Sequence, residues 1–412
     1  MDASTISSRV SPFDRSRAQA PLRITIVSET YPPEVNGVAL TLQRMLEGLR
    51  ARRHVMQLVR LRQHADDLPQ RARGFHEVLM RGVPIPRYAH LRMGVPCMRK
   101  LEQMWTMQRP DVVHIATEGP LGWSALQAAR HLKLPVSSDF RTNFHAYSCH
   151  YGVGWLQRAI VGYLRGFHNR TLTTMVPTPA LQRELAAQGF DHLRVVARGV
   201  DIAHLHPAKR NPVLRRVWGA GDDTVVVLCV ARLAGEKNIA LLWRAFEAIQ
   251  RRGIDARLVL VGEGPQRAQL QALCRGAHFA GVRRGEDLAA HYASADLFVF
   301  PSLTETFGNV VPEAMASGLP VVAFDQAAAG QLIRHGDNGW LAAPREPVQF
   351  VELAAHAAGD RAQLQTMGSR ARASALALDW QRVIDELEAV LRRAVAPLQP
   401  AQSPLLLRPL ST

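Results

Sequence analysis

Short apolar segments that alternate with helical segments constrain the fold of this chain more than any other feature. RITIVSE at 23–29 precedes a loop and the helical pattern VALTLQRMLEGLRAR, and similar strand patterns occur at 110–117 and 134–140. A second series begins with TVVVLCVARL at 224–233 and continues with ARLVLVGEG, ADLFVFPS and LPVVAFD. Strands that alternate with helices form parallel sheets covered by helices on both faces. The pattern therefore predicts an α/β protein.

Two such series in one chain of 412 residues predict two domains, because a single core rarely grows to this size. We expect a doubly wound, Rossmann-like parallel sheet over residues 22–205 and a second one over residues 206–378, facing each other across a cleft. The amphipathic pattern DWQRVIDELEAVLRRAVA predicts a last helix over 379–396. Residues 1–21 are expected to be a disordered leader, and the Pro-rich segment 397–412 a flexible tail.

The composition excludes several classes of protein. A hydrophobic content of 47% and a charged content of 21% are typical of a soluble globular chain. No apolar run approaches the roughly 20 residues that cross a bilayer, and residues 1–20 lack the apolar core of a secretory signal. The four cysteines are far apart, which indicates reduced thiols in a cytoplasmic protein and argues against a zinc site; they are Cys97, Cys149, Cys229 and Cys274.

The positive charge is concentrated in the first half of the chain. Residues 1–205 hold 27 Lys and Arg against 15 Asp and Glu, a net charge of +12, so the remainder contributes +3 of the total +15. Nucleic acid, an anionic membrane surface or an anionic substrate would each explain this asymmetry. An Arg-rich surface that is merely solvated explains it equally well.

The segment TETFGNVVPEAMASGLPVV places two carboxylates between buried strands. Glu305 follows the strand pattern ADLFVFPS, whereas Glu313 follows Pro312 in the first turn of a helix that Gly318 ends. The helix dipole alone would favour a glutamate there. Alternatively, both carboxylates face a cleft at the carboxyl edge of a parallel sheet, where each accepts hydrogen bonds from a vicinal diol. Free N–H groups at 307–310 would then suit a phosphate or a sugar hydroxyl.

The spacing Glu305-x7-Glu313, with Phe-Gly inside it, resembles the E-x7-E signature of retaining glycosyltransferases of family 4, which have the GT-B fold. The resemblance spans roughly residues 23–396. It implies two Rossmann-like domains, with the helix over 379–396 packing back on the N-terminal domain, which is the acceptor side. It also implies that Glu313 holds the donor ribose and Glu305 the donor hexose, with the intervening loop contributing Phe307, Gly308, Asn309 and Val310 to nucleotide-sugar binding.

Other segments resemble the same family in the same order. VARLAGEKN is similar to the G-R-x4-K-N segment, so Arg232 and Lys237 would bind the donor diphosphate. Only four of the 50 basic residues are lysines, so a lysine at position 237 is not explained by the composition of the chain. A solvated charge at the start of a helix remains an alternative. Weaker matches are VGEGP, where Gly264 allows close backbone approach, and FAGVRRG, where Gly281 and Val282 are candidates for holding the base.

Two loops of the first domain complete the resemblance. YPPEVNGV matches the P-P-x-x-x-G loop, in which the backbone of Gly37 would meet the diphosphate at a helix N-terminus. FRTNFHAYSCHYGVG resembles the segment whose histidine, here His145, contacts the donor sugar near its reactive carbon. The chain departs from the pattern at Arg141, where many relatives have histidine.

The resemblance implies a retaining hexosyltransferase that uses a nucleotide-diphosphate sugar as substrate and needs no cofactor. The pattern most resembles GDP-mannose-dependent α-mannosyltransferases, but users of UDP-glucose or UDP-N-acetylglucosamine share every motif. No D-x-D sequence occurs. Arg232, Lys237 and helix N-termini would neutralise the diphosphate instead, which predicts catalysis without a metal.

The acceptor is expected to be a glycan or a lipid-linked molecule. Residues 88–109 and 154–170 interleave basic with apolar side chains, either as two ordinary amphipathic helices or as a surface on the inner face of the cytoplasmic membrane. Rival functions are a nucleotide-sugar epimerase of the same fold and a basic nucleic-acid-binding protein, although no nucleic-acid module is recognisable. A phosphorylase would need a cofactor-bearing lysine late in the chain, and the last lysine is Lys237.

Overall fold

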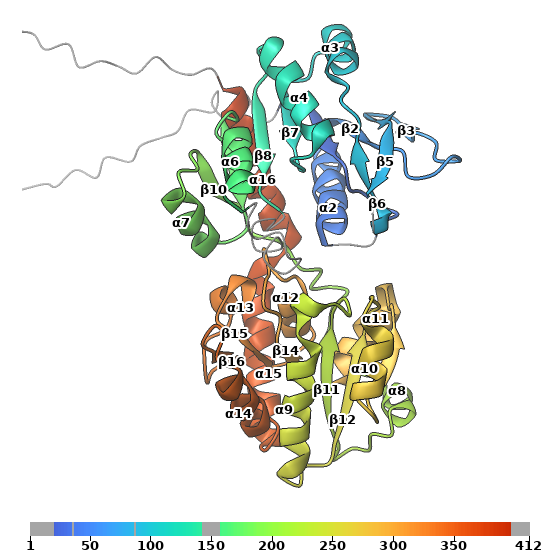
Figure 1. Cartoon of the computed structure of the whole chain (residues 1–412), viewed down its shortest axis with the longest axis vertical. Helices are drawn as coiled ribbons and strands as arrows, with labels where there is room; N and C mark the ends of the chain where they lie inside the picture. The colour runs from blue at the N-terminus through green and yellow to red at the C-terminus, as the bar shows by residue number, and fades with distance from the viewer. Residues whose placement is uncertain (1–19, 35–36, 86–87, 142–156, 397–412) are drawn as a thin grey trace, which may run out of the picture.

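Two helix-covered sheets, one above the other in Figure 1, make up the protein. The computed structural model describes residues 20–34, 37–85, 88–141 and 157–396. The upper sheet has eight strands and the lower sheet six, and a small two-stranded sheet accompanies the upper one. Both main sheets are built largely from parallel pairs, so the predicted α/β fold with two Rossmann-like domains is confirmed.

The first sheet has the strand order β10-β9-β8-β7-β1-β2-β4-β3. Only β3 runs antiparallel to its neighbour, at one edge. Ile24 of the central strand lies beside Met56 on one side and Val112 on the other. The strands are β1 (Arg23–Ser28), β2 (Val55–Leu61), β3 (Arg71–Ala72), β4 (Phe75–Met80), β7 (Val112–Ile115), β8 (Val136–Asp139), β9 (Thr173–Val176) and β10 (Leu193–Val195).

Alternate residues of each strand point to opposite faces of the sheet. Because both faces carry buried apolar side chains, helices cover both of them. Ile24 and Ile26 belong to one core, which contains the buried residues of α2 (Gly37–Ala51). Val27 belongs to the core on the other face, which α3 (Met98–Met107) and α4 (Pro120–His131) complete. Farther along the chain lie α6 (Gln157–His168) and α7 (Pro179–Ala187).

The small sheet corrects the interpretation of residues 88–109 as one amphipathic helix. Its strands are β5 (Gly82–Ile85) and β6 (Tyr88–Gly94), which pair antiparallel, and the helix α3 begins only at Met98. Gly94 and Pro96 explain the break, since glycine weakens a helix interior and proline removes a backbone donor. The apolar side chains before the break belong to β6, and those after it belong to α3.

The second sheet is parallel throughout, in the order β13-β12-β11-β14-β15-β16. Its strands are β11 (Val225–Val230), β12 (Ala256–Val261), β13 (His278–Gly281), β14 (Leu297–Phe300), β15 (Val321–Phe324) and β16 (Gly339–Ala342). The helices around it are α8 (Pro212–Val217), α9 (Ile239–Arg251), α10 (Arg267–Leu273), α11 (Gly285–Ser294), α12 (Val310–Ala316), α13 (Ala327–Leu332), α14 (Pro347–Ala357) and α15 (Arg361–Ala375).

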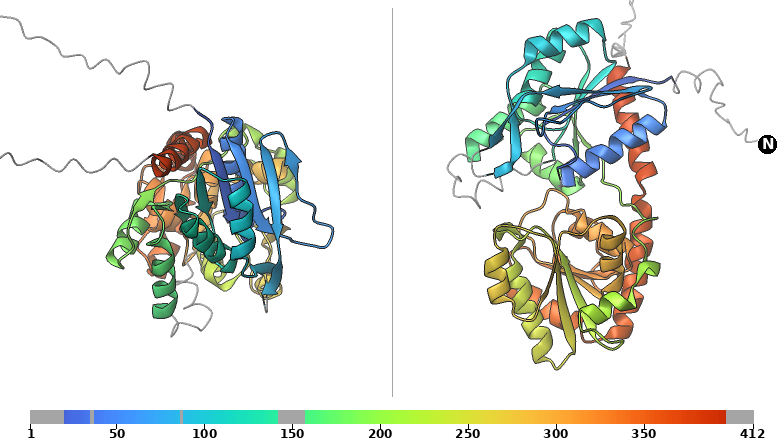
Figure 2. Two further views of the ribbon diagram at one scale, coloured as in Figure 1. Left: turned by 90° about the horizontal axis from the view of Figure 1, so that it is seen from above. Right: turned by 90° about the vertical axis from the view of Figure 1, so that its right-hand side faces the viewer.

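The chain crosses between the domains twice, and the two crossings lie side by side. The N–H of Val200 on the first crossing donates to the carbonyl of Leu378 on the second, at 2.9 Å. Gly199 packs so closely on Trp380 that a Cβ there would lie 2.5 Å from the ring. The last helix, α16 (Trp380–Val395), then buries Val383 and Ile384 against the α2 side of the first domain (Figure 2). The predicted return of the last helix to the first domain is confirmed.

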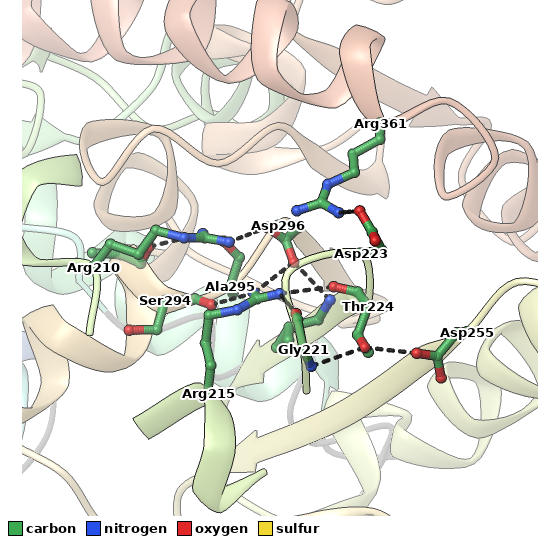
Figure 3. A network of polar contacts seen from close by, with 12 residues as sticks. Arg210, Arg215, Gly221, Asp223, Thr224, Asp255, Ser294, Ala295, Asp296 and Arg361 are labelled. Carbon is green, nitrogen blue, oxygen red and sulfur yellow. Dashed lines mark hydrogen bonds and ion pairs between the residues drawn. The ribbon is translucent and has the colours of Figure 1, made fainter. Parts of the chain in front are cut away.

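A polar network anchors the start of the second domain at the amino edge of its sheet (Figure 3). The guanidinium of Arg215 on α8 donates to the carbonyls of Ser294 and Thr224 and to the carboxylate of Asp296, at 2.8–2.9 Å. Asp296 also accepts the N–H of Val226 at the beginning of β11. The network therefore holds α8 to β11 and β14 at the edge opposite their carboxyl ends.

Candidate functional site

The two carboxyl edges meet where the strand order of each sheet reverses. In the second sheet β11 and β14 are neighbours although β12 and β13 lie between them in sequence, and in the first sheet β1 and β7 are neighbours although β2 to β6 lie between them. Ligands of open α/β sheets bind in the crevice at such switch points, outside the carboxyl ends of the strands. Lys237 follows β11 and Glu305 follows β14, so both predicted residues lie at the switch point of the second sheet.

Lys237 and Glu305 form an ion pair at this point. The side chains are 13% and 15% exposed, and the Ser302 hydroxyl also donates to Glu305 Oε1, at 2.8 Å. Partial burial makes the pair less screened by salt than a surface pair. The sequence placed both residues in the site for different parts of the donor, and the structure joins them into one charged unit at the crevice.

Arg232 lies at the rim of the same crevice. Its guanidinium forms an ion pair with Glu236, whose side chain is buried, while the Arg232 side chain is 44% exposed. Burial raises the pKa of Glu236, but the hydrogen bond from Arg232, a backbone hydrogen bond and the charges of Arg232 and Lys237 together outweigh this and hold the pKa below its usual value. Glu236 thus stays ionised at neutral pH and anchors Arg232 beside the loop that carries Lys237.

Glu313 is held by a residue that the sequence motifs did not include. The hydroxyl of Tyr292, on α11, donates to Glu313 Oε2 at 2.9 Å, and Tyr292 is fully buried. Burial raises the pKa of Glu313 to about 7, and the hydrogen bond from Tyr292 opposes the rise. Glu313 lies in the first turn of α12, as predicted. Because its pKa is about 7, its carboxyl group changes between the neutral and the charged form near neutral pH.

The raised pKa of Glu313 predicts that Glu313→Gln stabilises the fold but weakens donor binding. Because the folded-state pKa of Glu313 is raised above 4.5, its charge destabilises the fold as pH rises through about 7. We expect Glu313→Gln to raise the melting temperature at pH 8 and to leave it unchanged near pH 4. Donor nucleotide affinity should fall at pH 8, as measured by calorimetry. A lower melting temperature at pH 8 would contradict this account of Glu313.

The N-termini of α12 and α2, one from each domain, meet across the crevice. A Cβ on Gly37, the first residue of α2, would lie 3.3 Å from Asn309 Nδ2, at the start of α12. Gly308 has a φ of +88°, a conformation that favours glycine. Phe307 is only 1% exposed, so its ring lies in the core and its predicted donor contact would come from its backbone. Val310 begins α12, and its partly buried side chain packs against the core.

The weaker glycine candidates have structural explanations. A Cβ on Gly264 would lie 2.3 Å from the carbonyl oxygen of Leu233, so this glycine lets the loops after β11 and β12 pack together. Gly281, at the end of β13, has a φ of +73°. Val282 follows it and is 49% exposed, at the carboxyl edge where a base would be held. These observations leave the proposed donor contacts of all three residues as predictions.

In the first domain, the guanidinium of Arg141 is buried and forms an ion pair with Asp139. Its Nε donates to Asp139 Oδ2 at 2.7 Å, and His114 Nε2 lies 3.0 Å from the same oxygen. Burial raises the pKa of Asp139, but Arg141 and His114 outweigh it and lower the pKa to about 2. Arg141 therefore replaces the family histidine with a buried ion pair. His145 lies outside the described residues.

Sequence reasoning missed three side chains that the structure brings to the site. Tyr292 lies in a helix with no motif, and Ser302 ends a strand pattern as many small polar residues do. Arg198 lies at the domain boundary predicted from RGVDIAHLHP, and nothing in that segment indicated a site. Their only sequence signal is proximity to a strand end or to a domain crossing.

The described residues contain no group of three His, Cys, Asp or Glu side chains arranged to hold a metal ion. Cys97, Cys229 and Cys274 are free thiols there, and burial raises the pKa of Cys229 to about 12. Cys149 lies outside the described residues. No helix in the described part of the chain combines the length and the apolar character that crossing a bilayer requires.

Two family models match the chain, one for each domain. Residues 35–204 match "Glycosyltransferase Family 4", and residues 224–360 match "Glycosyl transferases group 1". Together they contain the loop at Gly37, the Arg232 and Lys237 segment and both glutamates.

Similar proteins cover nearly the whole chain. A GDP-mannose-dependent alpha-mannosyltransferase of Mycobacterium tuberculosis is 37% identical over 89% of this chain and 95% of its own length. An alpha-monoglucosyldiacylglycerol synthase of Streptococcus pneumoniae is 26% identical over 76% of this chain and 73% of its own. Among solved structures, a sucrose-phosphate synthase from Thermosynechococcus elongatus superposes with a TM-score of 0.75 at 18% identity, covering 90% of this chain and 98% of that one. The predicted GT-B fold is confirmed.

Proposed function

We propose that this chain, which belongs to glycosyltransferase family 4, transfers a mannosyl group from GDP-mannose with retention of configuration and without a metal ion. The observation that carries the donor is the 37% identity, over 89% of the chain, to an enzyme named for GDP-mannose and mannosyl transfer. The geometry of the crevice supports a nucleotide-diphosphate sugar. Lys237 and Glu305 lie at one switch point, and the N-termini of α2 and α12 meet beside them.

Each residue then has a role in charge stabilisation. In the transfer, the bond between the anomeric carbon and the β-phosphate oxygen breaks, and its electron pair leaves with the diphosphate. Arg232 and Lys237 stabilise that developing charge, together with the Gly37 backbone at the start of α2. Glu305 binds hexose hydroxyls, and Glu313 binds the ribose diol. The acceptor oxygen forms the new bond on the same face, and its proton passes to a departing phosphate oxygen.

A thermal-shift panel of GDP, UDP and ADP tests the donor. A ligand that binds only the folded state stabilises it by mass action and so raises the melting temperature. At a ligand concentration of 100 times Kd, the free energy of unfolding increases by about 2.7 kcal/mol. GDP should give the largest shift. A larger shift with UDP would replace the donor and leave the transfer chemistry in place, whereas no shift with any of the three would contradict a nucleotide-sugar enzyme.

Chelation tests the metal-independent mechanism. Because side-chain cations and helix N-termini supply the positive charge, we expect turnover to persist in excess EDTA at the rate seen without it. The measurement is the initial rate of GDP release before and after chelation. A loss of activity that magnesium or manganese restores would overturn this part of the proposal.

The surface of the first domain supports the proposal of a lipid-linked acceptor. On α3, Arg99 and Lys100 are exposed, while Leu101 and Trp105 are buried in the core. On α6, Tyr163 is exposed and stacks on Trp123 of α4, with ring centroids 5.6 Å apart. Basic and aromatic side chains on adjoining helices suit an anionic membrane surface. The lipid product in the name of the Streptococcus pneumoniae relative supports this acceptor class.

We expect co-sedimentation with phosphatidylglycerol vesicles at low salt, weaker binding as salt rises, and none with neutral vesicles. Each surface cation would contribute about 1 kcal/mol near the membrane. The double variant Arg99→Glu/Lys100→Glu should reduce binding, whereas Arg251→Glu/Arg252→Glu on the second domain should not. If the wild-type protein stays in the supernatant at low salt, the acceptor is not presented by such a surface.

A further inference from the structure

Arg198 lies on the first crossing between the domains, next to the Gly199 contact with Trp380. It lines a small cavity at the carboxyl ends of β8 and β9, which also has Thr41 of α2 and Asp139 in its wall. From the other domain, the ring of Phe307 approaches it, with 5.7 Å between the guanidinium carbon and the ring centroid. Arg198 is therefore a residue of the first domain that touches the loop of the second domain carrying Glu305.

The guanidinium of Arg198 is buried, and one of its nitrogens has no hydrogen-bond partner among the described residues. The residue is 7% exposed, and its Nη2 has no hydrogen-bond partner among the described residues. Burial and, after it, the charge of Arg141 lower the pKa of Arg198, the carboxylates of Asp139 and Glu305 oppose the change, and the net pKa is about 9. The side chain thus remains charged at neutral pH, in a position where an unpartnered donor costs about 1–3 kcal/mol or more.

Arg215 shows what a structural buried arginine looks like in the same protein. It is 4% exposed, and its two terminal nitrogens donate to three carbonyls and a carboxylate (Figure 3). Such a residue contributes to the fold through its contacts. Among the described residues Arg198 has no comparable set of hydrogen bonds, so contacts within that part of the fold do not account for its burial. Uncompensated polar groups of this kind are found where function requires them.

We propose that Arg198 binds the β-phosphate of the nucleotide-sugar donor, as a cation supplied by the first domain. The inference rests on the proposed function, because it names a further contact of the same donor. Arg198 and Lys237 come from different domains and both act electrostatically on Glu305, the residue assigned to the hexose. Of the two phosphates of the donor, the β-phosphate is bonded to the hexose, so it would lie nearer than the α-phosphate to a carboxylate that binds that hexose. A guanidinium offers it a two-pronged hydrogen bond that the Lys237 ammonium does not.

The consequence is that the diphosphate charge is neutralised from both sides of the crevice. Arg198 stands on the segment that joins the domains, so this contact requires the two domains to be together. When the bond to the anomeric carbon breaks, the electron pair moves onto the β-phosphate oxygen, and a contact with that phosphate strengthens as its charge grows. Arg198 would therefore affect both the binding of the diphosphate product and turnover.

The test compares a diphosphate with its monophosphate in wild type and in Arg198→Gln. Calorimetry measures the binding of GDP and GMP, with UDP and UMP as a second pair. We expect Arg198→Gln to weaken the diphosphate of the preferred base by about 10- to 100-fold, as loss of a charge-assisted hydrogen bond does, and to change the monophosphate by less than about threefold. Arg198→Lys should recover part of the loss, because the charge returns without the fork.

Melting temperatures separate this role from a structural one. Arg215→Gln should lower the melting temperature, because it removes the guanidinium that donates to three carbonyls and to Asp296, whereas Arg198→Gln should keep or raise it. The inference is overturned if Arg198→Gln binds the diphosphate as tightly as wild type, loses both nucleotides equally, or melts as low as Arg215→Gln. If wild type binds none of the nucleotides, the proposed function fails with it; unchanged binding in the variant alone leaves that function standing.

Discussion

Lys237→Ala is expected to lower kcat/KM by about 100- to 1,000-fold, the usual cost of removing one preorganised donor from a developing anion. The Lys237 ammonium lies between Ser302 and Glu305, with 3.4 Å between its Nζ and the Ser302 hydroxyl oxygen. Its loss removes positive charge from the proposed site of the leaving diphosphate. It also leaves Glu305 as an unpaired carboxylate, which repels the donor. Steady-state rates with the donor varied give the result.

The matched control is Lys209→Ala, in the same domain. Lys209 forms an ion pair with Glu286 at 2.6 Å, like Lys237 with Glu305, but Glu286 is 75% exposed. We expect this variant to retain wild-type kinetics, because solvent screens an ion pair whose carboxylate is so exposed. Arg232→Ala should give a smaller loss than Lys237→Ala, since the Arg232 side chain is 44% exposed and solvent screens its charge. Near-normal turnover of Lys237→Ala would contradict the assignment of this residue.

Glu305→Gln is the second variant expected to have a large effect, about 100-fold in kcat/KM, because a charged hydrogen-bond partner of the hexose is lost. The informative measurement is the double variant Lys237→Ala/Glu305→Gln. Residues that act as one unit are not additive, so the double variant should be about as impaired as Lys237→Ala alone. Removing the carboxylate that Lys237→Ala left unpaired would even recover some donor affinity.

The corresponding cycle with Lys209→Ala and Glu286→Gln controls for a general effect of breaking a salt bridge. It should show no coupling in kcat/KM, because Glu286 is 75% exposed and solvent screens the pair. Fully additive losses for Lys237 and Glu305 would mean that they act independently on the donor. The ion pair between them would then be incidental to catalysis.

Much of the second domain's site was predictable because its signals are local. Pro312 and Gly318 bound the helix that begins near Glu313, and the structure has α12 at Val310–Ala316 with Gly318 at a φ of +80°. The strand before Glu305 was readable from its apolar run. The first domain was less readable, since glycine and proline split residues 88–109 into a strand and a helix with similar apolar content.

The sequence by itself determined the elements, their αβ alternation, and which strand ends carry charged residues, since periodicity and turn residues act over a few positions. The tertiary structure decided which of those ends meet. Lys237 and Glu305 are 68 residues apart and pair because β11 and β14 became neighbours, with β12 and β13 added on the far side. Tyr292 reached Glu313, and Arg198 reached Phe307, by the same packing. Strand order and domain contact are set by the joint burial of many side chains, so no local pattern encodes them.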